Sequence, residues 1–400
     1  FVPRKKVAMK LLRSIVDKNS TLNTPSMVES LFKFVAPLMK DQSDTIPYED
    51  LVESDREQFA VEQRLVGRLI SLIRHDEDGQ LFQIYTVARK HFGKGGMNRI
   101  RYTLVPLVFG YIGLAARLKK SCASPAPKKE SSNPEDEELS EADKEKKEEQ
   151  NSSSKVSTKK ATKAAKKDFQ FIHEILTVLA GVDEYQNIAL YMFLEAAKAC
   201  DNFNFESIAY AFISKAFALY EDTANSKQRV RALQQVIGTL HGCVNFSEEN
   251  YDTLIKNTSK YAAKLLKKED QCSLVCQCTH LFWTGNGPNG EPPRNGQDDM
   301  VLQCLKRSLK IAEAVLDTVI NAKLFVDVLN EYLYFYAQEC PKIETKYLTG
   351  LVALCNQNIS ELDQDKEGTA AVVLHFKNTV KFIASKAKSG DKRYSAIDLP

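Results

Sequence analysis

Residues 54–75 read SDREQFAVEQRLVGRLISLIRH, and this stretch decides the fold class. Ser54 is followed three residues later by Glu57, a pairing that caps the start of many helices. The apolar side chains then recur at the spacing of one helix face, at Phe59, Leu65, Leu69, Leu72 and Ile73. The stretch therefore predicts an amphipathic helix that buries one face.

The same pattern continues on both sides of this helix. Before it, Thr24 and Pro25 form a cap-and-proline start for a helix that reaches Leu38. No convincing alternation typical of strands occurs, and most connections are only a few residues long. We expect further helices at residues 81–92, 100–117, 169–180, 187–200, 205–220, 227–241, 248–267, 272–283, 301–316, 322–339, 346–359 and 368–386.

This many helices with short turns cannot form one compact bundle. They can form a stack of antiparallel helix pairs, an α-solenoid, in which each pair covers the apolar faces of its neighbours. The spacing of successive pairs is about 40 residues, near that of HEAT and armadillo repeats, although no strict sequence repeat is visible. The predicted fold is therefore all-α, a solenoid of HEAT-like antiparallel helix pairs.

One segment has a different composition. Residues 119–167 are dominated by Lys, Glu, Ser, Ala and Pro, and no aromatic residue lies between Tyr111 and Phe169. Such a segment cannot bury enough apolar surface to offset its ordering entropy, so we expect a disordered charged insertion. The predicted organisation is a first solenoid part at residues 1–118, the insertion at 119–167, a second solenoid part at 168–388 and a flexible tail at 389–400.

The overall composition excludes several protein classes. The chain has 400 residues, of which 43% are hydrophobic and 27% charged, with a formal net charge of +3. This balance is typical of a globular protein and gives no reason to expect binding to nucleic acid. No apolar run approaches the length of a membrane span. Because Phe1 stands at the start and no signal peptide follows, we expect a fragment or a processed product.

The cysteines predict free thiols in a reducing, cytosolic compartment, because their number is odd and they lie in apolar helical stretches. Three of them, Cys272, Cys276 and Cys278, cluster with His280. Cys272, Cys276 and His280 share one helix face, but a row along one helix cannot surround a tetrahedral metal ion by itself. We therefore favour buried thiols over a zinc site. The nine cysteines are Cys122, Cys200, Cys243, Cys272, Cys276, Cys278, Cys304, Cys340 and Cys355.

Catalytic and cofactor motifs are missing. The nearest approach to a phosphate-binding loop is residues 91–96, HFGKGG, but no strand precedes it and no Ser or Thr follows Lys94. The glycines instead indicate a turn between helices. The carboxylates are scattered over helix faces, so acid–base catalysis has no support. We expect no enzyme activity, no cofactor and no metal.

Two groups of residues are candidates for contact with other proteins. His280, Phe282 and Trp283 end a helix at a loop, where aromatic side chains serve either as partner contacts or as a plug in the core. The lysines of residues 264–268 form either a solvated face or a surface for an acidic partner.

The chain resembles the vacuolar protein sorting-associated protein 35 family, the large solenoid subunit of retromer, in its C-terminal half. The similar stretches occur in the order of the family and extend over most of the chain. They are ARKHFGKGGMNRIRYTLVPLVF (88–109), SKAFALYED (214–222), CVNFSEEN (243–250), AAKLLKK (262–268), HLFWTG (280–285), CLKRSLKIA (304–312) and LNEYLYFY (329–336).

The resemblance implies a non-enzymatic scaffold of an endosomal cargo-retrieval coat. In the family, this half holds a small subunit of metallophosphoesterase fold on its concave face, and its distal end contributes to self-association, which implies a possible homodimer. The arrestin-like subunit contacts the N-terminal half, whose Pro-Arg-Leu-Tyr-Leu segment is missing here. The expected location is cytoplasmic, on the cytosolic face of endosomes, with only indirect attachment to the membrane.

The implied function leads us to expect specific contact residues. For the small subunit we expect contacts from His280, Phe282 and Trp283, and also from Arg99, Arg101 and Tyr102, because loop-edge aromatic residues and arginines serve as interface anchors. For self-association we expect Lys264, Lys267 and Lys268. The alternative is another HEAT-like scaffold, of the nuclear transport or phosphatase regulatory type.

Overall fold

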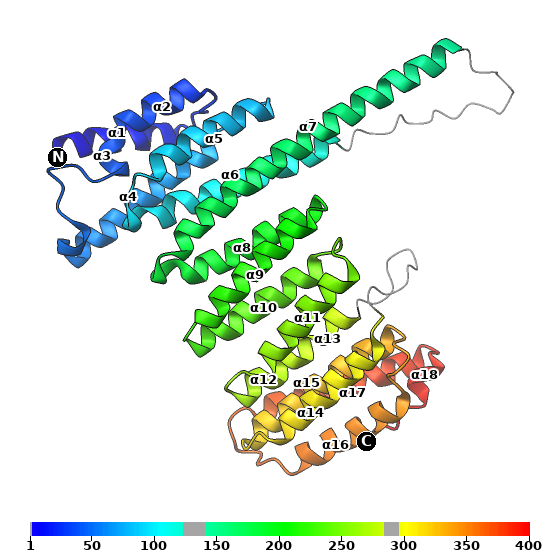
Figure 1. Cartoon of the computed structure of the whole chain (residues 1–400). Helices are drawn as coiled ribbons and strands as arrows, with labels where there is room; N and C mark the ends of the chain where they lie inside the picture. The colour runs from blue at the N-terminus through cyan, green and yellow to red at the C-terminus, as the bar shows by residue number, and fades with distance from the viewer. Residues whose placement is uncertain (1, 123–140, 284–295) are drawn as a thin grey trace. The chain divides into compact units, whose positions relative to one another are not determined.

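The computed structural model describes residues 2–122, 141–283 and 296–400 (Figure 1). Packing divides the chain into two compact units, Phe1–Leu219 and Tyr220–Pro400. Within the described ranges the only β structure is an isolated bridge between Leu22 and Ile73. The prediction of an all-α solenoid is confirmed.

The first unit is a run of helices in which chain neighbours pack against each other. The long α6 is central, because α4, α5 and α7 all pack against it, while α1 packs on α4 and α2 on α5. The helices are α1 (Val2–Asp17), α2 (Pro25–Phe34), α3 (Ala36–Met39), α4 (Glu53–Leu72), α5 (Asp78–Phe92), α6 (Met97–Cys122), α7 (Glu141–Ala180), α8 (Gln186–Asn202) and α9 (Glu206–Asp222), whose end falls in the second unit.

Local sequence signals set several of these elements. The Thr24 hydroxyl accepts a hydrogen bond from the backbone N–H of Met27, so this predicted cap is confirmed. Gly67 lets α4 approach α6 closely, since a Cβ atom there would lie 2.2 Å from the carbonyl oxygen of Tyr102. After α5, Gly96 adopts a φ of +77°, as a glycine turn between helices requires.

The second unit, taken by itself, is also built of packed helices. Helices α12, α15 and α17 lie side by side, and α14 and α16 pack across them. The aromatic-rich α15 supplies much of the core, with Phe325, Tyr332 and Phe335 buried. The helices are α10 (Ser226–Gly242), α11 (Glu248–Ala262), α12 (Lys268–Gln277), α13 (Thr279–Phe282), α14 (Asp298–Glu313), α15 (Thr318–Ala337), α16 (Thr345–Ser360), α17 (Thr369–Lys388) and α18 (Lys392–Ser395).

The capping pair predicted at Ser54 and Glu57 is wrong. Helix α4 begins at Glu53, and its N-cap is Val52. The Val52 carbonyl accepts from the backbone N–H groups of Asp55 and Arg56, each at 3.0 Å. Ser54 therefore already lies within the first turn and cannot cap it.

The predicted insertion at residues 119–167 needs correction at both ends. Residues 119–122 belong to α6 and residues 141–167 to α7, while residues 123–140 lie outside the described residues. Helix α7 packs on α6 and buries Ala165. Residues before and after the predicted insertion therefore lie in one compact unit.

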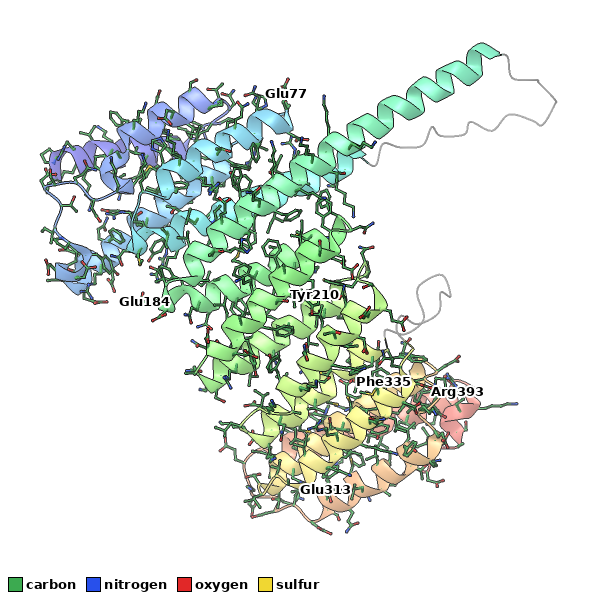
Figure 2. All side chains as sticks on the ribbon, viewed as in Figure 1. Glu77, Glu184, Tyr210, Glu313, Phe335 and Arg393 are labelled. Carbon is green, nitrogen blue, oxygen red and sulfur yellow. The ribbon has the colours of Figure 1, made fainter. Side chains whose placement is uncertain are left out.

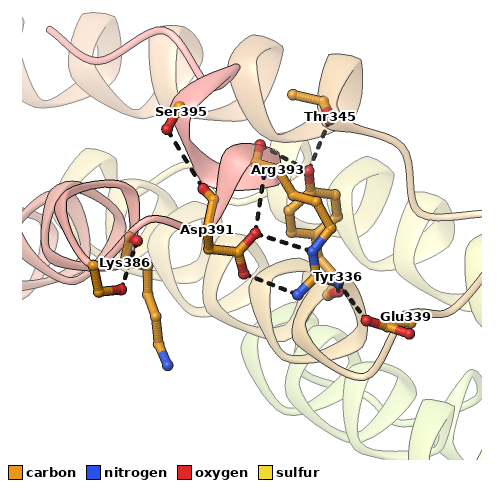
Figure 3. A network of polar contacts seen from close by, with 8 residues as sticks. Tyr336, Glu339, Thr345, Lys386, Asp391, Arg393 and Ser395 are labelled. Atoms are coloured by element: carbon orange, nitrogen blue, oxygen red, sulfur yellow. Dashed lines mark hydrogen bonds and ion pairs between the residues drawn. The ribbon is translucent and has the colours of Figure 1, made fainter.

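The predicted flexible tail at residues 389–400 also needs correction. The Asp391 carboxylate caps the short α18 by accepting from the backbone N–H of Arg393 at 3.1 Å. The side chains of Tyr394 and Ile397 are buried. Figure 3 shows Arg393 between Asp391 and Glu339, with ion-pair distances of 2.9 and 3.2 Å. Two apolar anchors and a polar network thus hold this segment on the helices before it.

Candidate partner-binding surface

A polar groove lies between α12, α15 and α17 in the second unit. Its cavity has a volume of about 510 Å³. Helix α15 supplies its floor, because Asp327, Asn330 and Glu331 recur at the spacing of one helix face. Helix α17 contributes His375, Thr379 and Phe382, and α12 contributes Cys272, Ser273, Cys276 and Gln277.

His280 lies at the edge of this groove. Its Nε2 atom is 2.8 Å from Oε2 of Glu331, which joins the short α13 to α15. Its ring centroid lies 4.8 Å from that of Tyr334 and 5.1 Å from that of Phe335. The predicted residue is therefore half-buried and held by α15, with its ring next to an exposed tyrosine.

A second histidine and a carboxylate join α15 to α17. Nε2 of His375 lies 3.1 Å from Oδ1 of Asp327 and 3.3 Å from Nδ2 of Asn330. The Thr379 hydroxyl donates to Oδ1 of Asn330 at 3.0 Å. The polar side chains of the groove are thus positioned by one another, and such preorganisation lowers the entropy lost on binding.

Aromatic side chains border this network. Phe382, on α17, is 43% exposed, and Tyr334, on α15, is 39% exposed. Exposed aromatic groups beside preorganised polar groups are typical anchors of protein interfaces. Phe335, labelled in Figure 2, follows Tyr334 on α15 but is fully buried, so only part of the aromatic run of this helix is exposed to solvent.

Two of the aromatic residues predicted for partner contact do not face solvent. Phe282 is fully buried, and Trp283 is only 6% exposed. The helical turn of α13 directs Leu281 and Phe282 into the core, and Trp283 follows them. These aromatic residues fill the end of the helix, as the alternative interpretation had it.

The second predicted group, Arg99, Arg101 and Tyr102, lies in the first unit, and its members differ in burial. Arg99 is 5% exposed, and its Nη2 pairs with Asp41 at 2.7 Å, so it cannot serve as an exposed anchor. Arg101 is half-buried, lies over the Tyr102 ring at 4.5 Å and approaches Tyr185 at 5.7 Å. Arg101 and Tyr102 remain available as a surface pair.

The predicted lysine cluster is exposed at Lys264, Lys267 and Lys268. Helix α11 ends at Ala262 rather than at residue 267, so the cluster occupies the turn between α11 and α12. Lys268 opens α12 and donates to Oε1 of Gln271 at 3.1 Å. The cluster therefore remains a surface of positive charge, but it lies in a turn and not at the end of a helix.

The thiols near His280 point into the core. Cys272, Cys276 and Cys278 are all buried, and the Cys272 thiol donates to the Ser308 carbonyl at 3.3 Å. Burial raises the pKa of Cys272 and of Cys278 to about 12. In the described ranges no three His, Cys, Asp or Glu side chains gather as metal ligands. The expected buried thiols are confirmed, except at Cys122, whose side chain lies outside the described residues.

Sequence reasoning missed the groove itself. Asp327, Asn330, Glu331 and Tyr334 recur at helical spacing within a stretch that otherwise consists of apolar core residues. This polar stripe was a usable signal. His375 and Phe382 had no such signal, because only packing brings α17 beside α15.

A sequence model of the vacuolar protein sorting-associated protein 35 family matches residues 1–358 of this chain. The chain belongs to this family. The Arabidopsis thaliana vacuolar protein sorting-associated protein 35A is 33% identical to it over 98% of this chain and 46% of that protein. The Dictyostelium discoideum protein 35 is 30% identical over 97% of this chain and 44% of its own length.

This member of the protein 35 family spans about half the length of the curated relatives that it matches. The Schizosaccharomyces pombe protein 35 is 38% identical, over 48% of this chain and 23% of that protein. A solved circular tandem repeat protein aligns at 11% identity with a TM-score of 0.37, which is too low to bear on function. In the described part of the chain, no helix combines the length and the hydropathy needed to cross a membrane.

Proposed function

We propose that this chain is a non-enzymatic scaffold segment of a retromer coat in endosomal cargo retrieval. Membership of the protein 35 family carries this proposal. It also favours retromer over the nuclear transport and phosphatase regulatory scaffolds. A stack of helix pairs provides long side-by-side faces for other proteins.

Within this role, the groove between α12, α15 and α17 binds the small subunit of metallophosphoesterase fold. The single observation that supports this site is a preorganised polar network with two partly exposed aromatic residues near it. Phe382 lines the groove, and Tyr334 contacts His280, which pairs with Glu331 of the groove. His280 takes part through its contact with Tyr334. Phe282 and Trp283 act by supporting α13 from the core.

Calorimetric titration of this chain with the small subunit tests the proposal. Phe382→Ala and Tyr334→Ala should each weaken binding by at least about tenfold, since aromatic anchors contribute roughly 2 kcal/mol or more. Leu316→Ala is the matched control, because Leu316 is almost fully exposed at the end of the α14 region and outside the groove. Unchanged affinity in both aromatic variants would move the interface elsewhere, and no binding by the parent chain would refute the partner.

Self-association through Lys264, Lys267 and Lys268 is a second part of the proposal. The three side chains are exposed and close in sequence, so they offer a positive surface to an acidic face of a second copy. Changing all three to Glu should shift a dimer to monomer in light scattering. Lys388, exposed at the end of α17, provides a control for a charge reversal elsewhere. A parent chain that stays monomeric at high concentration would contradict this part.

The remaining parts of the proposal concern location and further partners. The chain would act in the cytoplasm, on the cytosolic face of endosomes, with membrane attachment through other subunits. The arrestin-like subunit would bind the part of the family protein that this chain does not include. Nucleic acid, cofactors and metals have no place in this function. Recruitment of the labelled chain to endosomes, lost when the other coat subunits are depleted, would test the location.

A further inference from the structure

A second cavity, in the first unit, has no part in the proposed function. It lies between α2, α3 and α5, and its volume of about 300 Å³ is at the lower end of the range of ligand sites. Phe32 and Met39, both buried, form its apolar part. Its ionisable lining residues are Glu29 and Lys33 on α2, Lys40 directly after α3, Lys90 and His91 on α5, and Lys94 in the turn after α5.

Positive charge dominates this lining. The carboxylate of Glu29 is already paired, because its oxygens lie 2.8 Å from Nε2 of His91 and 3.1 Å from Nζ of Lys33. Three further lysines are exposed and form no ion pair with a described residue. Ammonium groups around one hollow repel one another, so an anion that carries several charges is favoured there. The three free cations are Lys40, Lys90 and Lys94.

The turn that carries Lys94 has no free backbone donor at residues 93–95. Their N–H groups donate to carbonyl oxygens of residues 89–92 at 2.9–3.2 Å. The stretch HFGKGG at residues 91–96 is therefore a closed turn and not a loop that cradles phosphate through its backbone. The turn instead presents Lys94 at the cavity, four residues after Lys90. An anion in this cavity is held by side-chain ammonium groups.

Phosphate esters fit these ammonium groups better than carboxylates do. Lysine is a compact point charge with three donors and is a common ligand of phosphate. A phosphate monoester carries a charge of about −1.5 to −2 near neutral pH and three strong acceptor oxygens, whereas a carboxylate carries a single charge. Several phosphates on one small ring concentrate this charge within the cavity, whereas an extended acidic peptide spreads its charge along the chain.

We propose that this cavity binds a ring bearing several phosphate groups, either a free inositol polyphosphate or the headgroup of a phosphoinositide lipid. Lys40 meets the ring from the α3 side, and Lys90 and Lys94 meet it from the α5 side, so that each ammonium group contacts a phosphate oxygen. Because Glu29 stays paired, its carboxylate opposes this contact only weakly.

Calorimetric titration of the full chain with inositol trisphosphate tests the proposed chemistry. Citrate is the matched probe, because it is a small anion that carries three carboxylates and no phosphate. We expect the trisphosphate to bind at least about tenfold more tightly than citrate at about 0.15 M salt. No binding of the trisphosphate, or equal binding of the two anions, would overturn the proposal.

Paired charge reversals locate the site. Lys90→Glu with Lys94→Glu should weaken trisphosphate binding at least about tenfold. The control is Lys377→Glu with Lys381→Glu, which makes the same change of net charge at the same spacing, at exposed positions of α17. Equal losses in the two double variants would overturn the site in favour of general electrostatic attraction.

A second set of variants keeps the test decisive. Lys90→Arg with Lys94→Arg retains both charges and should keep the affinity within about threefold of the parent chain. A loss as large as that of the glutamate pair would contradict recognition by charge. Circular dichroism shows whether each variant folds. Should the glutamate pair fail to fold, Lys40→Glu, at an exposed position after α3, decides the proposal through an expected loss of about threefold or more.

Co-sedimentation with vesicles distinguishes the two sources of the ligand. One set contains phosphatidylinositol bisphosphate, and the other contains phosphatidylserine at matched total charge. Sedimentation with the first set alone, abolished by Lys90→Glu with Lys94→Glu, would identify a lipid headgroup. Binding of the free trisphosphate without sedimentation would identify a soluble ligand. Equal sedimentation with both sets would show unspecific attraction to an anionic surface and would overturn the proposal.

Discussion

The hydroxyl of Tyr336 lies 3.0 Å from the main-chain carbonyl oxygen of Arg393 and 2.9 Å from Oγ1 of Thr345 (Figure 3). These contacts join the end of α15 to α18 and to the start of α16. The Tyr336 ring also packs edge-on against Tyr394, with centroids 5.4 Å apart. One buried hydroxyl thus connects three segments of the second unit.

Tyr336→Phe should lower the free energy of unfolding by about 1 kcal/mol, because it removes the hydroxyl and keeps the ring packing. Chemical denaturation followed by circular dichroism measures the change. The control is Tyr210→Phe, since the Tyr210 hydroxyl has no partner among the described residues. An unchanged free energy of unfolding in Tyr336→Phe would show that the hydroxyl does not hold α18 in place.

Replacing Gly67 and Gly113 with alanine should change the free energy of unfolding in opposite directions. At Gly67 the added Cβ would lie 2.2 Å from the backbone oxygen of Tyr102, so Gly67→Ala forces α4 and α6 apart. This variant should lower the free energy of unfolding by about 1–3 kcal/mol. At Gly113, on α6, a Cβ atom would have no other atom within 4 Å. Because alanine has the higher helix propensity, Gly113→Ala should raise the free energy of unfolding by about 0.5–1 kcal/mol. Equal effects in the two variants would contradict the close approach of α4 and α6.

Asp168 should make stability depend on pH. Burial raises the pKa of this carboxyl from its ordinary 3.8 to about 8, and the charge of Asp78 adds to the shift. The folded chain then holds this proton more tightly than the unfolded chain. Its stabilising contribution is full below about pH 4 and is lost as the pH rises through about 8.

Asp168→Asn checks this dependence, because an amide cannot ionise. The parent chain should lose stability between about pH 4 and 8 relative to this variant, by an amount on the order of a few kcal/mol. Thermal unfolding at a series of pH values measures it. Asp183→Asn, at an exposed position of the same unit, should leave the pH profile unchanged. Parallel profiles for the parent and Asp168→Asn would show that the carboxyl has another partner in solution.

The buried thiols should resist modification in the folded chain. Burial raises the pKa of Cys355 to about 12 and that of Cys304 to about 11, and it also keeps reagents away. In a chain carrying Cys122→Ser, the other cysteines are all buried. Iodoacetamide at about pH 8 should label them slowly until denaturant is added, as mass spectrometry will show. Rapid labelling of Cys276 under native conditions would contradict its burial.

Much of the fold could be predicted because helix formation follows local patterns. The cap at Thr24 and the apolar periodicity of residues 322–339 gave helices close to those observed. The predictions failed where tertiary packing, and not local composition, decides whether a segment is ordered. Residues 159–167 look like a solvated linker, yet Ala165 is buried against α6, and the chain end is held by Tyr394 and Ile397.

The candidate site was predicted less completely. His280 was identified from its place at the end of a helix, but Phe282 and Trp283 proved to be buried. The residues that complete the groove, among them His375 and Phe382, lie on a helix far along the chain. No local signal links α17 to α15, so their meeting could not be read from the residues alone.

The sequence by itself determined the helical class, the family and the free, buried cysteines, because periodicity, spacing and matching stretches are all properties of the linear chain. Only the tertiary structure decided which aromatic residues face solvent, that the buried carboxyl group of Asp168 has no hydrogen-bond partner among the described residues, and that Gln63 and Arg99 line one cavity. The reason is that burial and unmet hydrogen bonds depend on side chains brought together by packing, whose separation in sequence carries no information about their distance in space.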